Sequence, residues 1–344
     1  GSQDHSRIIR LSYHTPTYVE LAKRAYAAWA AVEADAAEPL IIKTGGLDLF
    51  PAEAAIASED YTNSMDTCGV PYEWLNAAEV MARWPQFRLT DDVRAIYQTE
   101  TGIAPAAKCN AAHIRLAQAH GATLRERVHI TAVHDEGGEI TVATDEGTYH
   151  AQKLIIAAGA WSNHTLAHFG VQLPLTVTQE QVSYYATPHL AQFAPDRFPV
   201  WIWMDDPCYY GFPVYGEAGT KTAQDVGGHE VTAESRTFDP DLLREAKQQA
   251  FLQQVLPDSL GPVILTKTCL YTMPPDRDFV VDTLPEHPNV AVGIGAGHAF
   301  KYASVLGQTL AELVLDGETP ADVRPFQIDR PILLEENPLK QFLV

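Results

Sequence analysis

Apolar residues that recur every three or four positions predict several helices along the chain. The clearest runs from Leu21 through Ala25 and Trp29 to Val32, with Lys23 on the opposite face. This is the pattern of an amphipathic helix of about five turns that buries one face. Further helices are predicted over residues 52–68, 77–84, 108–120, 242–255 and 302–315.

For two of these helices the sequence also predicts a detail, a capping residue in one and the buried face in the other. Asn76 directly precedes the helix at 77–84 and is expected to cap it, because a short polar side chain can bind the free backbone N–H groups there. In the helix at 108–120, the apolar residues Ile114, Leu116 and Ala117 are expected to face the core.

Short apolar runs separated by turn residues predict two kinds of sheet. The continuous apolar run at 153–159 is typical of a strand buried on both faces in a parallel α/β sheet. Aromatic-rich runs broken by Pro, Gly and Asp predict a mostly antiparallel sheet instead. Those runs cover 183–186, 200–203, 208–212 and 219–223, and other short strands are predicted at 41–50, 95–99, 123–124, 128–130, 140–143, 148–150, 266–271 and 290–294.

Composition places the chain among ordinary globular proteins. Its 344 residues are 46% hydrophobic and 20% charged, and a prior of about 150 residues per domain suggests two domains. The net charge of −20 disfavours nucleic acids and anionic lipid surfaces as partners. No apolar run approaches the roughly 18 residues that a membrane span needs.

The four cysteines, at positions 68, 109, 208 and 269, show no pairing pattern and no metal-binding spacing. We therefore expect no metal site and a reducing, cytoplasmic location.

Candidate chemistry is concentrated near the C-terminal end. Cys269 and Tyr271 lie on a predicted strand, and the segment Gly295-Ala-Gly297-His298 leads into a helix that carries Lys301. A glycine-rich turn before a helix lets backbone N–H groups approach an anionic or electron-accepting ligand.

Two more segments add cations and phenols: Arg7, Arg10 and Tyr13 near the start, and Tyr210 with Lys221 in the middle. Cations and phenols together suit a pocket for a small carboxylate.

Each of these residues also has a plain structural interpretation. Cys269 alone would be a buried apolar thiol, and Arg7 with Arg10 would be a surface pair. The tyrosines would be sheet packing. Lys301 is harder to explain in this way, because a lysine at a helix start opposes the helix dipole and needs a counter-anion.

The motifs together resemble a known family, the monomeric sarcosine oxidase and N-methyltryptophan oxidase group of FAD-dependent amine oxidoreductases of D-amino-acid-oxidase type. The resemblance follows the family order along essentially the whole chain. It rests on Gly1-Ser2, Ser6-Arg7-Ile8-Ile9-Arg10, Lys43-Thr44-Gly45, Arg83-Trp84-Pro85, residues 153–161 ending in Gly159-Ala160-Trp161, Tyr209-Tyr210-Gly211-Phe212-Pro213, Lys221, Cys269-Leu270-Tyr271-Thr272, Asp278 to Asp282, Gly297 to Lys301 and Arg330-Pro331.

The resemblance implies a role for each candidate residue. Cys269 would attach covalently to the flavin, Lys221 would activate dioxygen, and Arg7 would lie over the flavin ring. Arg10 and Lys301 would grip the substrate carboxylate. The remaining implied positions are Tyr210 and Tyr271 around the substrate amine, Tyr13 in the substrate pocket, Val128 at the adenosine part, and Gly159, Trp161, Gly295, Gly297, His298 and Lys301 beside the cofactor.

The fold implied is α/β (α+β): a Rossmann-like FAD-binding domain interleaved with an antiparallel-sheet substrate domain. The expected boundaries are 1–38, 104–172 and 277–335 for the FAD domain, and 39–103 and 173–276 for the substrate domain. The implied reaction is oxidation of a secondary amino acid such as sarcosine by hydride transfer to flavin N5, with dioxygen reduced to hydrogen peroxide by a monomeric enzyme.

The sequence also departs from the family. The family's initial strand and GxGxxG turn, which cradle the cofactor diphosphate, are absent before Gly1, so an N-terminally truncated domain with poor FAD binding is expected. Asp225 stands where many members have a histidine. The alternatives are a flavin dehydrogenase, a primary amino-acid oxidase on the same fold, or an inactive remnant that cannot hold FAD.

Overall fold

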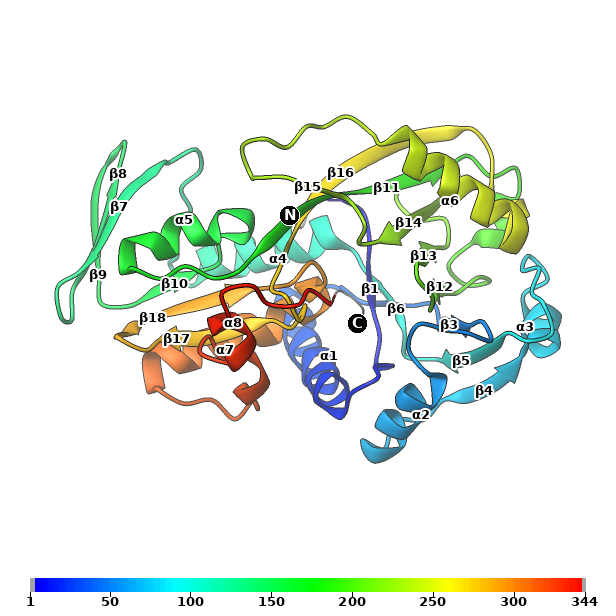
Figure 1. Ribbon diagram of the computed structural model, residues 1–344, viewed down its shortest axis with the longest axis horizontal. Helices are drawn as coiled ribbons and strands as arrows, with labels where there is room; N and C mark the ends of the chain where they lie inside the picture. The colour runs from blue at the N-terminus through cyan, green and yellow to red at the C-terminus, as the bar shows by residue number, and fades with distance from the viewer. Residues whose placement is uncertain (1–3, 342–344) are drawn as a thin grey trace.

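Four sheets organise residues 4–341, the part of the chain that the computed structural model describes (Figure 1). The largest has nine strands within that range, in the order β15-β11-β14-β13-β12-β3-β5-β4, with β16 also paired to β11. Its strands are β3 (Gly46–Phe50), β4 (Glu73–Asn76), β5 (Arg94–Gln98), β11 (Thr176–Tyr185), β12 (Val200–Trp203), β13 (Cys208–Phe212), β14 (Thr220–Asp225), β15 (His229–Glu230) and β16 (Val263–Met273).

All pairings in this sheet are antiparallel except the parallel pair β3–β12. The prediction of a mostly antiparallel sheet is therefore confirmed.

The second sheet is mixed and contains one parallel pair, which involves the strand that the run at 153–159 predicts. β10 (Leu154–Ile156) pairs in parallel with β18 (His287–Ile294), which pairs antiparallel with β17 (Val280–Leu284). A third sheet joins β1 (Arg7–Ile9), β6 (Gly102–Ala104) and β2 (Ile42–Lys43). The fourth, formed by β7 (Ile130–Asp135), β8 (Ile140–Thr144) and β9 (Gly147–Ala151), lies at the far left end of the molecule in Figure 1.

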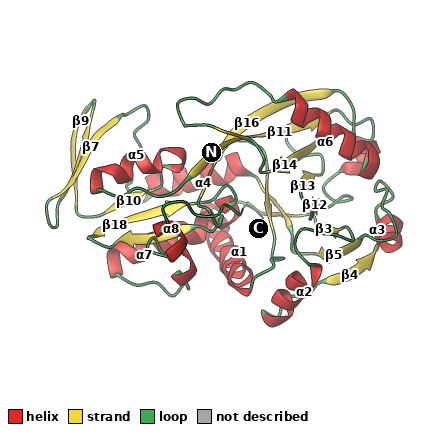
Figure 2. Ribbon diagram, viewed as in Figure 1, coloured by secondary structure: helices red, strands yellow, loops and turns green. Residues whose placement is uncertain are grey.

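Helices cover the sheets, as Figure 2 shows. α1 (Pro16–Ala36) buries Leu21, Ala25 and Trp29 as its periodicity predicts, and it contacts α7 (Ala303–Asp316). α6 (Leu242–Val255) packs on the large sheet, where Phe251 stacks on Tyr209 with ring centroids 4.3 Å apart. The remaining helices are α2 (Ser58–Thr67), α3 (Ala77–Arg83), α4 (Ala106–Ala119), α5 (Ser162–Leu166) and α8 (Pro331–Leu334). No helix of residues 4–341 is long and apolar enough to cross a membrane.

Two predicted elements start late or are missing. The helix predicted from residue 52 begins only at Ser58, because the segment after Pro51 turns back on itself through a hydrogen bond from Ala54 N to Pro51 O. Residues 123–124 form no strand.

Two predictions of burial are wrong. In α4 the buried side chains are the small ones at Ala106, Cys109 and Ala112, and the last two pack near Trp29. Ile114 is 44% exposed, Ala117 is also exposed, and Leu116 is only partly buried. In β10 only Ile156 is buried and Ile155 is 42% exposed, because β10 is an edge strand whose described neighbours cover one face.

The predicted cap at Asn76 is confirmed and provides a stability test. Its side chain accepts a hydrogen bond from Glu79 N at 3.0 Å, and the Glu79 carboxylate accepts one from Asn76 N at 2.8 Å. Asn76→Ala should lower the free energy of unfolding by about 1 kcal/mol, because α3 loses its capping box. Urea denaturation measures this loss. The control Asn63→Ala, at an exposed position inside α2, should leave stability unchanged or slightly raised, since Ala is the better helix former. Equal losses in the two variants would contradict the capping role.

Candidate active site

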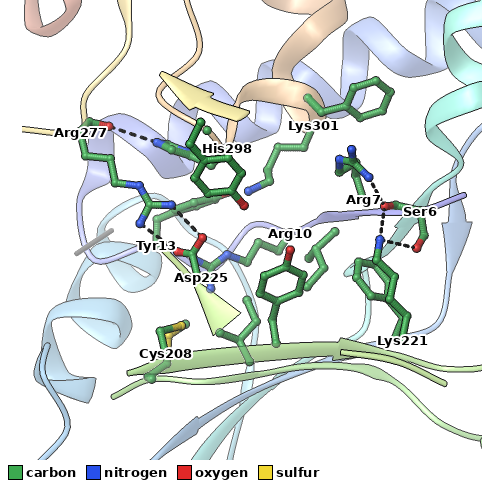
Figure 3. Close-up of a pocket in the computed structure, with 18 residues that line it drawn as sticks. Ser6, Arg7, Arg10, Tyr13, Cys208, Lys221, Asp225, Arg277, His298 and Lys301 are labelled. Carbon is green, nitrogen blue, oxygen red and sulfur yellow. Dashed lines mark hydrogen bonds and ion pairs between the residues drawn. The ribbon is translucent and has the colours of Figure 1, made fainter. Parts of the chain in front are cut away.

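One cavity brings together segments that are far apart in the sequence (Figure 3). Its walls come from β1 and the loop after it, strands β12 to β14, β16, and the segment after β18. Nine of the predicted site residues line it: Arg7, Arg10, Tyr13, Tyr210, Lys221, Tyr271, Gly297, His298 and Lys301. The sequence reasoning therefore selected residues that share one site.

Lys221 lies at one side of the cavity, together with Ser6 (Figure 3). Its Nζ is 2.6 Å from Asp4 Oδ2 and donates hydrogen bonds to the Ser6 carbonyl at 2.9 Å and the Ser6 hydroxyl at 3.2 Å. The ammonium group also lies over the Phe212 ring, 4.5 Å from its centroid. Burial lowers the pKa of Lys221 to about 8 although Asp4 opposes this, so the lysine is still largely a cation near neutral pH.

Asp4 is a shared counter-ion that the sequence did not single out. Besides Lys221, its carboxylate pairs with Lys267 at 3.1 Å and with Arg7 at 3.5 Å, and it accepts a hydrogen bond from Tyr184 Oη at 2.8 Å. Burial alone would raise the pKa of Asp4, but Lys221 first, and then the hydrogen bond from Tyr184, hold it well below its usual value. Asp4 is therefore a carboxylate throughout the neutral range.

Arg10 has an internal carboxylate partner. Its Nη1 donates to Asp48 Oδ1 at 3.1 Å, and both side chains are more than nine-tenths buried. Burial opposes the charge and is the largest single influence, but Asp48 together with Tyr13 and Tyr61 outweighs it and raises the pKa of Arg10 above its usual value. Among residues 4–341, Arg10 Nε is a buried donor that has no hydrogen-bond partner.

Lys301 lies next to Arg10 in the cavity, as Figure 3 shows. The Arg10 guanidinium is 4.6 Å and Lys301 Nζ is 5.7 Å from the Tyr13 ring centroid, so both cations face the same phenol. No carboxylate of the described residues forms an ion pair with Lys301. Burial lowers its pKa, and the nearby Arg10 adds to the effect. The two cations predicted to grip a carboxylate are thus neighbours.

The glycine turn before Lys301 has a structural reason. Gly297 has φ +81°, and a Cβ there would lie 2.4 Å from the Tyr271 ring. Lys301 itself falls in a 3₁₀ turn, Ala299–Tyr302, and its carbonyl accepts a hydrogen bond from Trp29 Nε1 at 2.7 Å. α7 begins only after this turn, at Ala303, so Lys301 precedes the helix.

A further ion pair at the cavity was missed by the sequence reasoning. Arg277 holds Asp225 with two contacts, Nη1 to Oδ2 and Nη2 to Oδ1, both 2.9 Å. Arg277 is 1% exposed and has φ +58°, a conformation that non-glycine residues rarely adopt. Both residues line the cavity, as does Cys208, which lies opposite Asp225 in the β13–β14 pairing. The one feature of the sequence that pointed to this pair was Asp225, which stands where many family members have a histidine.

His298 also contacts this region. Its Nε2 is 3.2 Å from the Arg277 carbonyl, and its ring lies 4.6 Å from the Phe279 ring. Burial, followed by the charges of Arg277 and Lys301, keeps its pKa well below the usual value. His298 is therefore neutral at physiological pH.

The remaining predicted residues lie outside the cavity wall. Cys269 is partly buried in β16, two residues before Tyr271 and hence on the same side of the strand. Gly295 lies directly after β18, before the turn that leads to Lys301. Val128 precedes β7, and Gly159 and Trp161 form a 3₁₀ turn after β10, with Trp161 49% exposed.

Comparison with known proteins gives a consistent result. The model of a family described as FAD dependent oxidoreductase (DAO) matches residues 2–313. Monomeric sarcosine oxidase from Bacillus sp. (strain NS-129) is 29% identical over 336 residues, which cover 96% of this chain and 87% of the relative. N-methyl-L-tryptophan oxidase from Salmonella heidelberg (strain SL476) is 30% identical over 332 residues, which cover 94% and 87%.

A solved structure agrees with these matches. NikD, described as an unusual amino acid oxidase essential for nikkomycin biosynthesis, superposes with a TM-score of 0.83 at 26% identity and covers 94% of this chain and 86% of its own. The chain therefore belongs to the DAO family of FAD-dependent oxidoreductases and is an amino-acid or amine oxidoreductase of the sarcosine oxidase type.

Proposed function

We propose that the protein oxidises a secondary, N-methylated amino acid, with FAD as cofactor and dioxygen as electron acceptor. The observation that carries the proposal is a shared cavity that has Lys221 at one side and the neighbouring cations Arg10 and Lys301 in the same space. One cation near the ring of a flavin and two near a carboxylate are what such an oxidation requires.

The residues of the cavity fit the ring portion of FAD. Within residues 4–341, Arg10 Nε, Tyr13 Oη and His298 Nδ1 are buried polar atoms without partners, and all three residues line the cavity. Such atoms need a polar ligand, because an unsatisfied buried donor or acceptor is costly. Arg7 and Lys221 add positive charge that suits a ring which becomes anionic on reduction.

We assign the cofactor's ring to Arg7, Lys221, His298 and the turn at 295–297, and its adenosine side to Val128, Gly159 and Trp161. When bound, FAD would accept a hydride at N5 from the substrate carbon and pass the electrons to dioxygen, leaving an imine that water hydrolyses.

The protein's own side chains would position the substrate. Lys301 and the free Nε edge of Arg10 would bind its carboxylate, and this fixes the carbon next to the amine. Tyr210 and Tyr271 would enclose the amine and exclude water, which strengthens the electrostatic interactions within the site. Lys221 would hold its proton near the oxygen-reacting edge, where a positive charge stabilises a developing anion.

The proposal is tested by anaerobic mixing of the purified flavoprotein with sarcosine, other N-methyl amino acids and their primary counterparts. We expect bleaching of the flavin absorbance by the N-methyl compounds, followed by rapid recovery and one hydrogen peroxide per turnover when oxygen is admitted. Faster bleaching by primary amino acids would favour a primary amino-acid oxidase. Recovery that needs an artificial acceptor would favour a dehydrogenase, and a protein with no flavin bands would be an inactive remnant.

Cys269 offers a separate test of how the cofactor is attached. Its position on the Tyr271 side of β16 supports our proposal that it is the covalent link to the flavin. Flavin absorbance should therefore stay with the polypeptide after acid or urea denaturation, and Cys269→Ser should release it entirely. Cys208→Ser, a matched control that changes the other thiol near the site, should retain the colour on the chain. Release of flavin from the unaltered protein would refute the covalent link.

A further inference from the structure

We propose that Asp48 and Asp225 restrict this site to substrates that carry a single carboxylate. They would do so by occupying two of the cavity's arginines, Arg10 and Arg277, with carboxylates that belong to the protein. The inference rests on the proposed function and specifies which amino acids the same site accepts.

The first internal carboxylate is Asp48 of β3. It is 5% exposed and lies 3.1 Å from Arg10 Nη1. The Ser12 hydroxyl hydrogen-bonds its other oxygen, so both oxygens have partners. Arg10 Nε is a buried donor without a partner among the described residues. Arg10 can therefore still donate a hydrogen bond to a ligand, but its charge is already balanced by Asp48.

The second internal carboxylate is Asp225 at the end of β14. Its two oxygens are both held by Arg277, each at 2.9 Å. Figure 3 shows this pair on the side of the cavity opposite Lys221, next to Tyr13 and Arg10. The fork of Arg277 matches a carboxylate with two parallel contacts, which is the arrangement a substrate's second carboxylate would otherwise use.

On this side of the cavity, one cation is left without a carboxylate partner among the described residues, so one ligand anion can be neutralised there. Arg10 is balanced by Asp48 and Arg277 by Asp225. Lys301 is the remaining cation on this side, and no carboxylate of residues 4–341 forms an ion pair with it. His298 is neutral and adds no charge. The other cavity cations, Arg7 and Lys221, share Asp4 on the opposite side.

The second carboxylate of a dicarboxylate would therefore be repelled by carboxylates of the protein. The first carboxylate of such a ligand would bind Lys301, and its second would lie close to Asp48 or Asp225 without a free cation. Like charges placed together in a site of low dielectric are strongly unfavourable, which is how specificity against a related ligand is achieved.

The test compares ligands that differ by one carboxylate. Binding of sarcosine, iminodiacetate and N-methylaspartate is measured by the ligand-dependent rise in melting temperature, which does not depend on turnover. For the unaltered protein we expect sarcosine to bind at least about tenfold more tightly than either dicarboxylate, a difference of about 1.4 kcal/mol. In Asp225→Asn and in Asp48→Asn the freed arginine should bind the second carboxylate, so that one or both dicarboxylates bind at least about tenfold more tightly than before.

A matched control separates this effect from a general loss of stability. Asp276 holds Arg330 with two contacts, at 2.7 and 2.9 Å, in the same way as Asp225 holds Arg277, but neither residue lines the cavity. Asp276→Asn should lower the melting temperature without any gain in dicarboxylate binding. If Asp225 and Asp48 were merely structural, their variants would behave in the same way.

The possible outcomes distinguish failure of this inference from failure of the proposed function on which it rests. If sarcosine binds and reduces the flavin but neither variant gains dicarboxylate binding, the restriction is wrong and the proposed function stands. If the unaltered protein binds a dicarboxylate as tightly as sarcosine, the restriction is wrong even where a variant fails to fold. If no amino acid binds or reduces the flavin, the proposed function fails and the restriction fails with it.

Discussion

Lys221→Met is expected to slow reoxidation of the reduced flavin by about 10²- to 10³-fold while leaving flavin reduction by the substrate nearly unchanged. Removal of one group that stabilises developing negative charge in a closed site has an effect of this size. The reason lies in the position of Lys221, which is 2% exposed and lies at the opposite side of the cavity from Arg277 and Asp225. Stopped-flow measurement of the two half-reactions separates the effects.

Lys267 provides the matched control, because it pairs with the same Asp4 carboxylate but its side chain is 40% exposed. Lys267→Met should therefore leave both half-reactions close to those of the unaltered protein. A loss of flavin reduction as large as the loss of reoxidation in Lys221→Met would contradict the assignment.

The pH dependence gives the same test without a substitution. With a pKa of about 8, Lys221 is an ammonium group below that pH and loses its charge above it. Reoxidation should therefore be fastest below about pH 8 and decline as the pH rises through that value. The decline should be absent in Lys221→Met.

Lys301→Met is expected to weaken substrate binding by about 30-fold or more without lowering the stability of the ligand-free protein. The first effect follows because the substrate carboxylate would lose its charged partner, which costs about 2 kcal/mol or more. Isothermal titration with sarcosine measures it. A change in the maximal rate with no change in affinity would argue against a role in carboxylate binding.

The second effect follows from the charge of Lys301. Folding lowers its pKa, so its protonated form is disfavoured in the folded protein at neutral pH. Met removes this cost and keeps a similar chain length. The melting temperature should therefore be unchanged or higher. Arg10→Met, by contrast, should lower the melting temperature, because it leaves the buried Asp48 carboxylate without its cationic partner. A large loss of stability in Lys301→Met would contradict this account.

Much of the fold follows from local pattern. β12, β13 and α6 all have the predicted bounds. Turn residues flank the two strands and a capping residue precedes the helix, so the sequence marks where each element begins or ends. Burial was harder to predict. Cys109 lies inward in α4 and Ile114 outward because the face of α4 that packs near Trp29 and Leu40 is set by neighbours distant in the sequence.

The site was predictable where a motif identified its residues and not where partners are set by tertiary contacts. Lys221 and Lys301 were singled out from the residue pattern, the family resemblance supplied their expected roles, and both line the cavity. Asp4, Asp48 and Arg277 were not chosen, because acids and arginines are common on any surface and only the fold shows which of them meet. Asp225 was noticed as a departure, but its partner could not be identified from spacing.

The interleaved sheets also determine when the molecule can assemble during its synthesis. β3 can pair with β12 only after the ribosome has added residue 203, and β10 must wait for β18, which ends at Ile294. Contacts between such distant segments form slowly and leave early strands exposed. Because Lys301 follows β18, the cavity is among the last parts of the nascent chain to be completed, and an interrupted polypeptide would contain Lys221 and Arg10 without a site between them.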